Sequence, residues 1–119
     1  MRTQPASAYL PLRPVEFEIL LTLAQGERHG YAIIQETEAR SDGSMVLETG
    51  TMYRALRRLV SDGLAKPTAR RPVDDSGDER RRYYAITALG RQVAAAEAER
   101  MARLIAVARA AQLLPREAP

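Results

Sequence analysis

Three arginines recur at helical spacing in one short stretch of the chain, Arg54, Arg57 and Arg58. At about 100° per residue they share one side of a helix, opposite an apolar stripe of Met52, Ala55, Leu56, Leu59 and Val60. Like charges at this spacing repel by about 0.2–0.5 kcal/mol per pair, and no acid within the helix body offsets that repulsion. Guanidinium groups suit DNA phosphates and guanine edges. A solvated charged face is the alternative for this cluster taken alone.

A second set of arginines belongs to a predicted β-hairpin. Residues 64–70, interrupted by Pro67, predict an edge strand, and residues 81–86 predict its antiparallel partner. A polar loop, too long for a tight turn, joins them. The arginines of this hairpin are Arg70, Arg71, Arg80, Arg81 and Arg82. The loop acids lack the glycine and ligand spacing of a calcium loop, so we expect a solvated tip; they are Asp74, Asp75, Asp78 and Glu79.

Three predicted helices precede the hairpin, and one follows it. The first begins at Pro14 and ends at Gly26, and the second covers residues 30–40 with Tyr31, Ile33 and Ile34 as its buried side. Thr49 is the expected N-cap of the arginine-bearing third helix. The fold class is therefore mainly α with a small β-hairpin, a winged helix-turn-helix. In that arrangement the helix after the turn, which carries the three arginines, enters the major groove.

The last predicted helix begins after Thr87, runs for about 27 residues and ends near Leu114. It is rich in alanine, a strong helix former, and is too long for the domain to cover. The apolar stripe on its outer part consists of Met101, Leu104, Ile105, Ala108 and Ala111. We expect the same helix of a second subunit to cover this stripe; folding back onto the first helix is the alternative.

These elements give a flexible N-terminal arm (1–13), a winged helix-turn-helix domain (14–86), a dimerisation helix (87–114) and a tail (115–119). The 119 residues carry a formal net charge of +3, which favours a polyanionic partner. The chain has no cysteine, which excludes disulfides and thiolate metal sites. Neither a signal peptide nor an apolar run of about 20 residues is visible. We expect a cytoplasmic protein.

An ordered set of short motifs resembles the PadR family of bacterial transcriptional regulators. The set consists of Gly26, His29-Gly30-Tyr31, Gly50-Thr51-Met52-Tyr53, Leu56, Leu59, Asp62-Gly63-Leu64, Arg82-Tyr83-Tyr84, Thr87 and Gly90. The resemblance covers about residues 15–92 and is closest to the subgroup with a short C-terminal helix. It implies a winged-helix homodimer, usually a repressor of an inverted-repeat operator. Arg54 stands where many members have proline, and the tryptophan on which some relatives stack aromatic drugs is missing.

The predicted function is sequence-specific DNA binding by a homodimer that regulates transcription. Arg54 is the first candidate for reading a base, and Arg57 contacts a base edge or a phosphate. The remaining DNA-binding candidates are expected at phosphates: Thr49, Gly50, Thr51, Tyr53, Arg58, Arg80, Arg81 and Arg82. A ligand-sensing or protein-interaction module that does not bind DNA is the alternative function, and a small-molecule effector is compatible with both.

An enzyme is the weakest reading of this chain. It has no glycine-rich phosphate loop and no nucleophile with a base and an orienting group. His29 is the only histidine and lacks partners at metal-ligand spacing, so we expect it to make a structural hydrogen bond. No metal or other cofactor is predicted.

Overall fold

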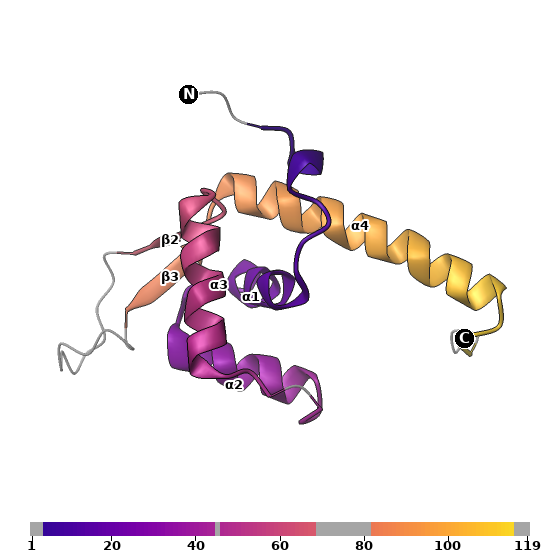
Figure 1. Cartoon of the computed structure of the whole chain (residues 1–119), viewed down its shortest axis with the longest axis horizontal. Coiled ribbons are helices and arrows are strands. Elements are labelled where there is room, and N and C mark those ends of the chain that lie inside the picture. The colour runs from indigo at the N-terminus through magenta and orange to yellow at the C-terminus, as the bar shows by residue number, and fades with distance from the viewer. Residues whose placement is uncertain (1–3, 45, 69–81, 116–119) are drawn as a thin grey trace.

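The computed structural model describes residues 4–44, 46–68 and 82–115. In chain order the elements are η1 (Ala6–Tyr9), α1 (Pro14–Ala24), β1 (Arg28–His29), α2 (Gly30–Arg40), α3 (Thr49–Ser61), β2 (Ala65–Pro67), β3 (Tyr83–Ile86) and α4 (Ala88–Ala110). Helices α1, α2 and α3 form one cluster, with β2 and β3 beside α3 (Figure 1). Helix α4 starts against this cluster and then projects away from it. The predicted fold class is confirmed.

The apolar stripe of α3 forms the centre of the core. Met52, Ala55, Leu56 and Leu59 are at most 1% exposed. They belong to one buried cluster with α1 residues Ile19, Leu20 and Leu23 and with Val93 of α4. Burying such a side chain stabilises a fold by about 1.5–3 kcal/mol. The helical period of α3 therefore predicts correctly which side of the helix faces the interior.

The sheet has three antiparallel strands in the order β1-β3-β2. The β2–β3 hairpin pairs Ala65 with Ile86 and Pro67 with Tyr84. Strand β1 adds Arg28 opposite Tyr84, where the sequence predicts only a tight connection between helices. Two residues are too few to show the alternation by which a strand is recognised. This pairing fixes the hairpin to the segment that joins α1 and α2.

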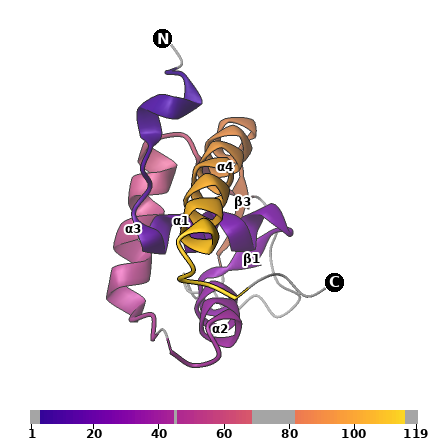
Figure 2. The same ribbon diagram turned by 90° about the vertical axis from the view of Figure 1, so that its right-hand side faces the viewer.

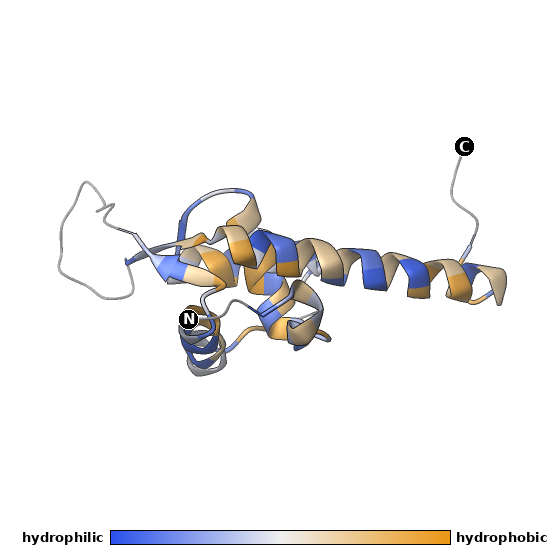
Figure 3. Cartoon of the chain, turned by 90° about the horizontal axis from the view of Figure 1, so that it is seen from above, coloured by the Kyte–Doolittle hydropathy of each residue, from blue (hydrophilic) through white to orange (hydrophobic). Residues whose placement is uncertain are grey.

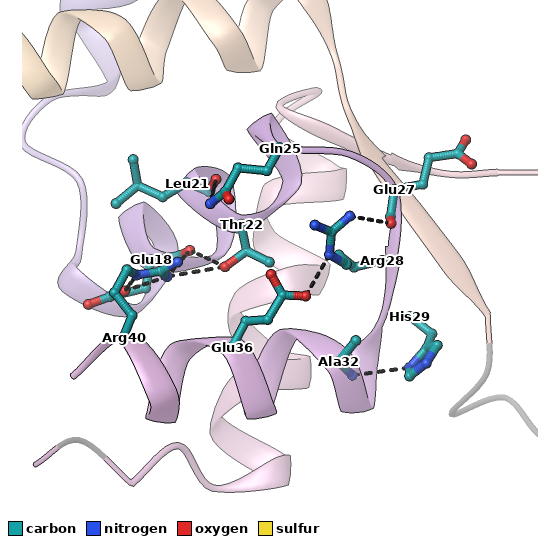
Figure 4. Close-up of polar contacts among 10 residues, drawn as sticks. All are labelled: Glu18, Leu21, Thr22, Gln25, Glu27, Arg28, His29, Ala32, Glu36 and Arg40. Carbon is teal, nitrogen blue, oxygen red and sulfur yellow. Dashed lines mark hydrogen bonds and ion pairs between the residues drawn. The ribbon is translucent and has the colours of Figure 1, made fainter. Parts of the chain in front are cut away.

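Helix α2 begins with a cap from His29. The His29 Nδ1 atom accepts a hydrogen bond from the Ala32 backbone N–H at 3.1 Å (Figure 4), which confirms the expected structural role. Tyr31, predicted to be buried, is 60% exposed. The buried residues of α2 are Gly30, Ile33 and Thr37, and two residues along a helix turn a side chain by about 200°. Tyr31 therefore lies on the opposite side from Ile33.

Ion pairs fix α2 to its neighbours (Figure 4). The Arg40 Nη2 atom donates to Glu18 Oε1 at 2.6 Å and to Thr22 Oγ1 at 3.1 Å, both on α1. The Arg28 Nε atom, just before α2, donates to Glu36 Oε2 at 2.6 Å. The contacts of Arg40 join α2 to α1, and the Arg28–Glu36 pair joins α2 to β1.

Helix α4 starts close against the turn that follows α3. Its N-cap, Thr87, accepts a hydrogen bond from the Gly90 N–H at 2.9 Å and donates one to the Gly63 carbonyl oxygen at 2.6 Å. A Cβ atom at Gly90 would collide with the carbonyl oxygen of Leu64. Glycine at position 90 therefore allows α4 to begin this close to the hairpin.

Helix η1 and Leu12 pack on α4, whereas the sequence predicts a flexible arm over residues 1–13, of which the structure describes residues 4–13. Helix η1 contacts α4, and Leu12 is only 8% exposed. The Leu12 backbone N–H donates to Glu97 Oε2 at 2.7 Å, and Arg100 Nε donates to the other carboxylate oxygen. The Glu97 carboxylate is fully buried and therefore joins the segment to α4. A side chain that accepts from a backbone group 85 residues away leaves no periodic signal in the sequence.

Acidification is expected to weaken this junction. The hydrogen bond from Arg100, aided by the one from Leu12 and opposed by burial, lowers the pKa of Glu97 from its ordinary value of 4.5. A group whose pKa is lowered by folding adds stability above its unfolded-state pKa and loses that contribution as the pH falls through the folded-state pKa. Glu97→Gln should therefore show a smaller loss of unfolding free energy than wild type between about pH 6 and pH 3. Urea unfolding across this range measures the difference, and equal pH slopes for the two proteins would contradict it.

The distal half of α4 extends beyond the rest of the described chain (Figures 1 and 3). The helix ends at Ala110, four residues before the end expected near Leu114. Figure 2 looks nearly along α4 and shows α3 to one side of it and β3 to the other. Within the described residues, no helix is long and apolar enough to cross a membrane.

Candidate nucleic-acid interface

The outer face of α3 carries two of the three predicted arginines. Arg54 and Arg57 are both exposed, and Arg54 Nη2 donates to Thr51 Oγ1 at 3.3 Å. Thr49 and Gly50 are exposed in the first turn. The N-cap is Glu48 rather than Thr49, because Glu48 has extended backbone angles and Thr49 is the first helical residue.

Arg58 points to a different neighbour from the other two arginines. Its Nε atom donates to Glu16 Oε2 on α1 at 2.8 Å, and the Glu16 side chain is only 12% exposed. One of the three arginines is therefore paired with an acid on α1, which lies 42 positions earlier in the chain. The spacing within α3 could not reveal this partner. Arg58 joins α3 to α1, which makes it a weaker candidate for a phosphate contact than the sequence suggests.

Removing Arg58 is expected to affect folding stability as well as any binding. Arg58→Ala leaves the mostly buried Glu16 carboxylate without its partner, and an unpaired buried charge costs more than the pair contributes. Arg58→Ala should therefore lower the unfolding free energy by about 1–3 kcal/mol. Combining it with Glu16→Gln should restore part of that loss.

Urea unfolding of the two single variants and the double variant measures this coupling. Arg57→Ala is the matched control, because Arg57 has no ion-pair partner among the described residues. If Arg58→Ala were as stable as Arg57→Ala, the ion pair would have no structural role.

A groove of about 440 Å³ separates α3 from the hairpin. Its charged and polar lining comes from Arg57, Ser61 and Tyr53 of α3 and from Arg82 beside β3. Its apolar lining consists of Leu56, Val60, Pro67 and Tyr84. Arg57 and Arg82 are both exposed, so the groove brings together arginines from two segments that are distant in sequence. The other hairpin arginines, Arg70, Arg71, Arg80 and Arg81, lie outside the described residues.

Tyr53 lies where α3 meets the start of α2. Its hydroxyl is close to Gly30, where a Cβ atom would collide with it. The ring is half-buried and packs against the core, as expected for a residue between the two faces of α3. Tyr84 and Ile86 of β3 also pack against the core.

The outer stripe of α4 is largely uncovered. Leu104 is 55% exposed and Ile105 is 41% exposed, while Met101 and Ala108 are half-buried. Val107, which the sequence analysis did not single out, is 66% exposed. The helix therefore does not fold back on α1 over these residues.

Groups that could hold a metal ion are absent from residues 4–44, 46–68 and 82–115. The acids of the hairpin loop, Asp74, Asp75, Asp78 and Glu79, fall outside these ranges. The described part of the chain therefore gives no support to a metal centre.

The sequence matches the model of a known protein family. Residues 19–96 match the family described as "Transcriptional regulator PadR-like family". The chain belongs to the PadR-like family. The matched residues include all of α2 and α3, both hairpin strands and the first part of α4, but they end before Met101. The PadR-like match therefore covers the groove and leaves the exposed stripe of α4 outside.

Solved structures of transcriptional regulators have the same fold. A transcriptional regulator from Clostridium thermocellum is 28% identical, with a TM-score of 0.65, over 87% of this chain and 89% of its own. A PadR family transcription regulator from Clostridium difficile R20291 is 27% identical, with a TM-score of 0.65, over 80% of this chain and 94% of its own. Bacillus subtilis PadR, solved in complex with operator DNA, has a TM-score of 0.60 at 19% identity over 92% of this chain and 52% of its own. That last likeness is one of fold alone.

Two curated relatives match by sequence. An uncharacterized 37.1 kDa protein in transposon TN4556 of Streptomyces fradiae is 38% identical over 86 residues, which are 72% of this chain and 22% of that protein. Uncharacterized protein X of Lysinibacillus sphaericus is 33% identical over 73 residues, which are 61% of this chain and 64% of that protein. The chain thus spans about a fifth of the first relative and less than two thirds of the second.

Proposed function

We propose that this PadR-like protein is a sequence-specific DNA-binding regulator of transcription that acts as a homodimer. The observation that carries the proposal is the groove shared by Arg57 of α3 and Arg82 of the hairpin, with Arg54 exposed on the same helix. A polyanion that lies along this face would meet cations from both elements. Double-stranded DNA has the regular negative charge that such a surface suits. The protein is a cytoplasmic binding protein in this proposal, and none of its residues has a catalytic role.

The residues of α3 have two roles in DNA binding, base contact and phosphate contact. Arg54 and Arg57 reach base edges from the exposed side of α3, where a bidentate contact to guanine is the commonest specific one. Thr51 and Tyr53 contact phosphates and fix the register of the helix, together with Thr49 and Gly50 at its N-terminus. Arg58 supports α3 through Glu16.

The hairpin contributes affinity without reading sequence. Arg82 approaches a phosphate across the groove from Arg57. Arg80 and Arg81, which lie outside the described residues, are proposed to add phosphate contacts. Each cation that neutralises a phosphate releases a condensed counterion, so binding should weaken steeply as salt rises. Arg82→Ala is expected to weaken binding to all sequences alike and to flatten this salt dependence.

A second copy of the chain covers the stripe formed by Met101, Leu104, Ile105 and Ala108. Large apolar side chains that are 41% and 55% exposed at adjacent positions on a projecting helix are stabilised by burial against the same helix of a partner. A two-fold dimer places its two α3 helices at half-sites about one helical turn apart, which suits an inverted repeat. Binding at such an operator represses transcription when it excludes the polymerase.

Binding to the DNA upstream of the protein's own gene tests the proposal. Fluorescence anisotropy with that duplex, a scrambled duplex of the same composition and a series of salt concentrations gives both the specificity and the salt slope. We expect the protein to bind the upstream duplex more tightly than the scrambled duplex. We also expect it to repress a reporter gene fused to the upstream sequence. Absence of binding to either duplex at low salt would indicate instead a ligand-sensing or protein-interaction module.

A further inference from the structure

The uncovered stripe of α4 continues the side of the helix that faces its own domain. Ala94 is 8% exposed and Glu97 is fully buried. The stripe follows from them at alternating steps of three and four residues, through Met101, Leu104 and Ala108. Such steps keep residues on one side of a helix. The projecting half of α4 therefore turns its apolar side in the direction in which the domain lies.

This direction decides how the helix of a second copy can pack on the stripe. Helix α1 packs on the first half of α4. In a parallel pair, the first half of one α4 would need the space beside the other that α1 already fills. In an antiparallel pair, the two projecting halves meet, and each domain lies beyond the free end of the partner's helix. A two-fold homodimer built on this stripe is therefore antiparallel, and each of its contacts occurs twice.

The free end of α4 carries two exposed leucines on an ordered turn. Gln112 has a positive φ of 65°, and the Leu113 backbone N–H donates to the Ala108 carbonyl oxygen at 2.9 Å. This combination closes the end of a helix and fixes the direction in which the chain leaves it. Leu113 is 77% exposed and Leu114 is 38% exposed. These two leucines form the apolar tip of α4.

Symmetry determines what the apolar tip meets in an antiparallel pair. The centre of the stripe lies between Leu104 and Ile105. Leu113 lies eight positions after Ile105, and Glu97 lies seven positions before Leu104. The tip of one helix therefore reaches the level of Glu97 on the other. At that level the N-terminal segment (residues 5–12) is attached to α4 by the hydrogen bond of 2.7 Å that Glu97 accepts from its backbone.

We propose that the apolar tip of each subunit docks on the partner's N-terminal segment, beside the partner's Tyr9 and Leu10. Both side chains pack against the core of their own subunit and are only half-buried, so part of each stays open to a second copy. Glu97 and Arg100 hold the segment on α4 before any partner arrives, and a surface ordered in advance costs less entropy on binding. The inference rests on the homodimer of the proposed function and adds the element that receives the end of the partner's helix.

The area that a stable dimer needs supports this contact. An interface of standard size buries about 800 Å² on each partner. The part of α4 from Met101 to its end at Ala110 is about 15 Å long and about 10–12 Å wide, so one side of it supplies only a part of that area. Docking of both tips adds apolar surface at each end of the helix pair. It also prevents the helices from sliding along each other, which fixes the distance between the two α3 helices and hence the spacing of the half-sites.

A spin label on the N-terminal segment tests the contact in the full-length protein. The chain has no cysteine, so Ala8→Cys, at an exposed position of η1, provides a single attachment site. Spin-labelled protein is mixed with isotope-labelled wild type, so that broadening of wild-type amide signals reports on the neighbouring subunit. Ser7→Cys is a second exposed site on η1. Lys66→Cys is the matched control, because β2 lies at the opposite end of the molecule from the apolar tip (Figure 1).

We expect either η1 label to reduce the Leu113 and Leu114 amide signals of the mixed dimer at least about twofold, and the Lys66→Cys label to leave them unchanged. Leu113→Asp should raise the dimer Kd at least about tenfold in sedimentation equilibrium, because docking would bury an unpaired charge. Ala106→Asp, at an exposed position off the stripe, should change the dimer Kd less than about twofold.

The possible outcomes separate the tip contact from the proposed homodimer. A dimeric protein in which neither η1 label broadens the tip signals, or in which the β2 label broadens them as strongly, would overturn the tip contact and leave the homodimer standing. A dimer Kd that Leu113→Asp leaves unchanged would also overturn the tip contact. A wild-type protein that stays monomeric at micromolar concentrations would overturn both the tip contact and the homodimer.

Discussion

Arg54→Ala is expected to reduce affinity for the operator about 5- to 150-fold, which corresponds to about 1–3 kcal/mol. Arg54 is exposed on the outer face of α3, and its one hydrogen bond among the described residues is the 3.3 Å contact to Thr51. The substitution should therefore remove the proposed base contact while leaving the fold intact. The loss should be confined to sequences with the preferred base pair, so specificity relaxes at one position of each half-site.

Anisotropy with the operator and with duplexes changed at single base pairs measures this loss. Arg54→Lys is the informative companion variant, because lysine keeps the charge and lacks the planar fork for bidentate contact to guanine. Arg103→Ala, an exposed arginine on the distal half of α4, controls for the loss of one positive charge. If Arg54→Ala bound operator and scrambled DNA as wild type does, Arg54 would have no role in reading bases.

Ile105→Glu combined with Leu104→Glu is expected to have the largest effect on DNA binding. The two substitutions place carboxylates in the stripe on which we propose that a partner helix packs, and burying unpaired charges there is costly. Loss of the proposed dimer would remove the simultaneous binding of two half-sites, which contributes about 10²- to 10⁴-fold in affinity. A monomer should keep its fold, because both residues lie outside the buried core.

Sedimentation equilibrium measures whether the double variant still dimerises, and operator binding measures how much affinity it loses. Ala106→Glu is the matched control, since Ala106 is exposed and lies about 140° around α4 from Met101, which is near the middle of the stripe. The control should stay dimeric and bind operator as wild type does. A wild-type protein that is monomeric at micromolar concentrations, or a double variant that remains dimeric, would contradict the role of α4.

Periodicity explains why so much of the fold is readable from the sequence. The stripe of α3 repeats at the helical period and is buried as predicted except at Val60, which is half-buried. Pro14 marks the start of α1 as expected. Thr87 is the N-cap of α4, as its position after the hairpin indicates. These signals are local, so neighbouring residues suffice to interpret them.

The contacts that were missed join residues far apart in the chain. Arg58 pairs with Glu16, and Leu12 is held by Glu97. Each partner is an acid on another helix, and nothing in the spacing around Arg58 or Leu12 points to it. Strand β1 was not predicted, because two residues are too few to show the alternation of apolar and polar side chains that is typical of a strand. For the interface, the residue types of α3 predict which arginines are outside, whereas only the tertiary structure shows that Arg58 has a partner.

A titration of isotope-labelled protein with the upstream duplex, followed through backbone amide shifts, tests the convergence of α3 and the hairpin most directly. The account predicts that the shifts gather on the first turns of α3, around Arg57 and around Arg82 at the same DNA concentrations. Shifts that gather on α2 or on the distal half of α4, with Arg57 and Arg82 unchanged, would contradict it.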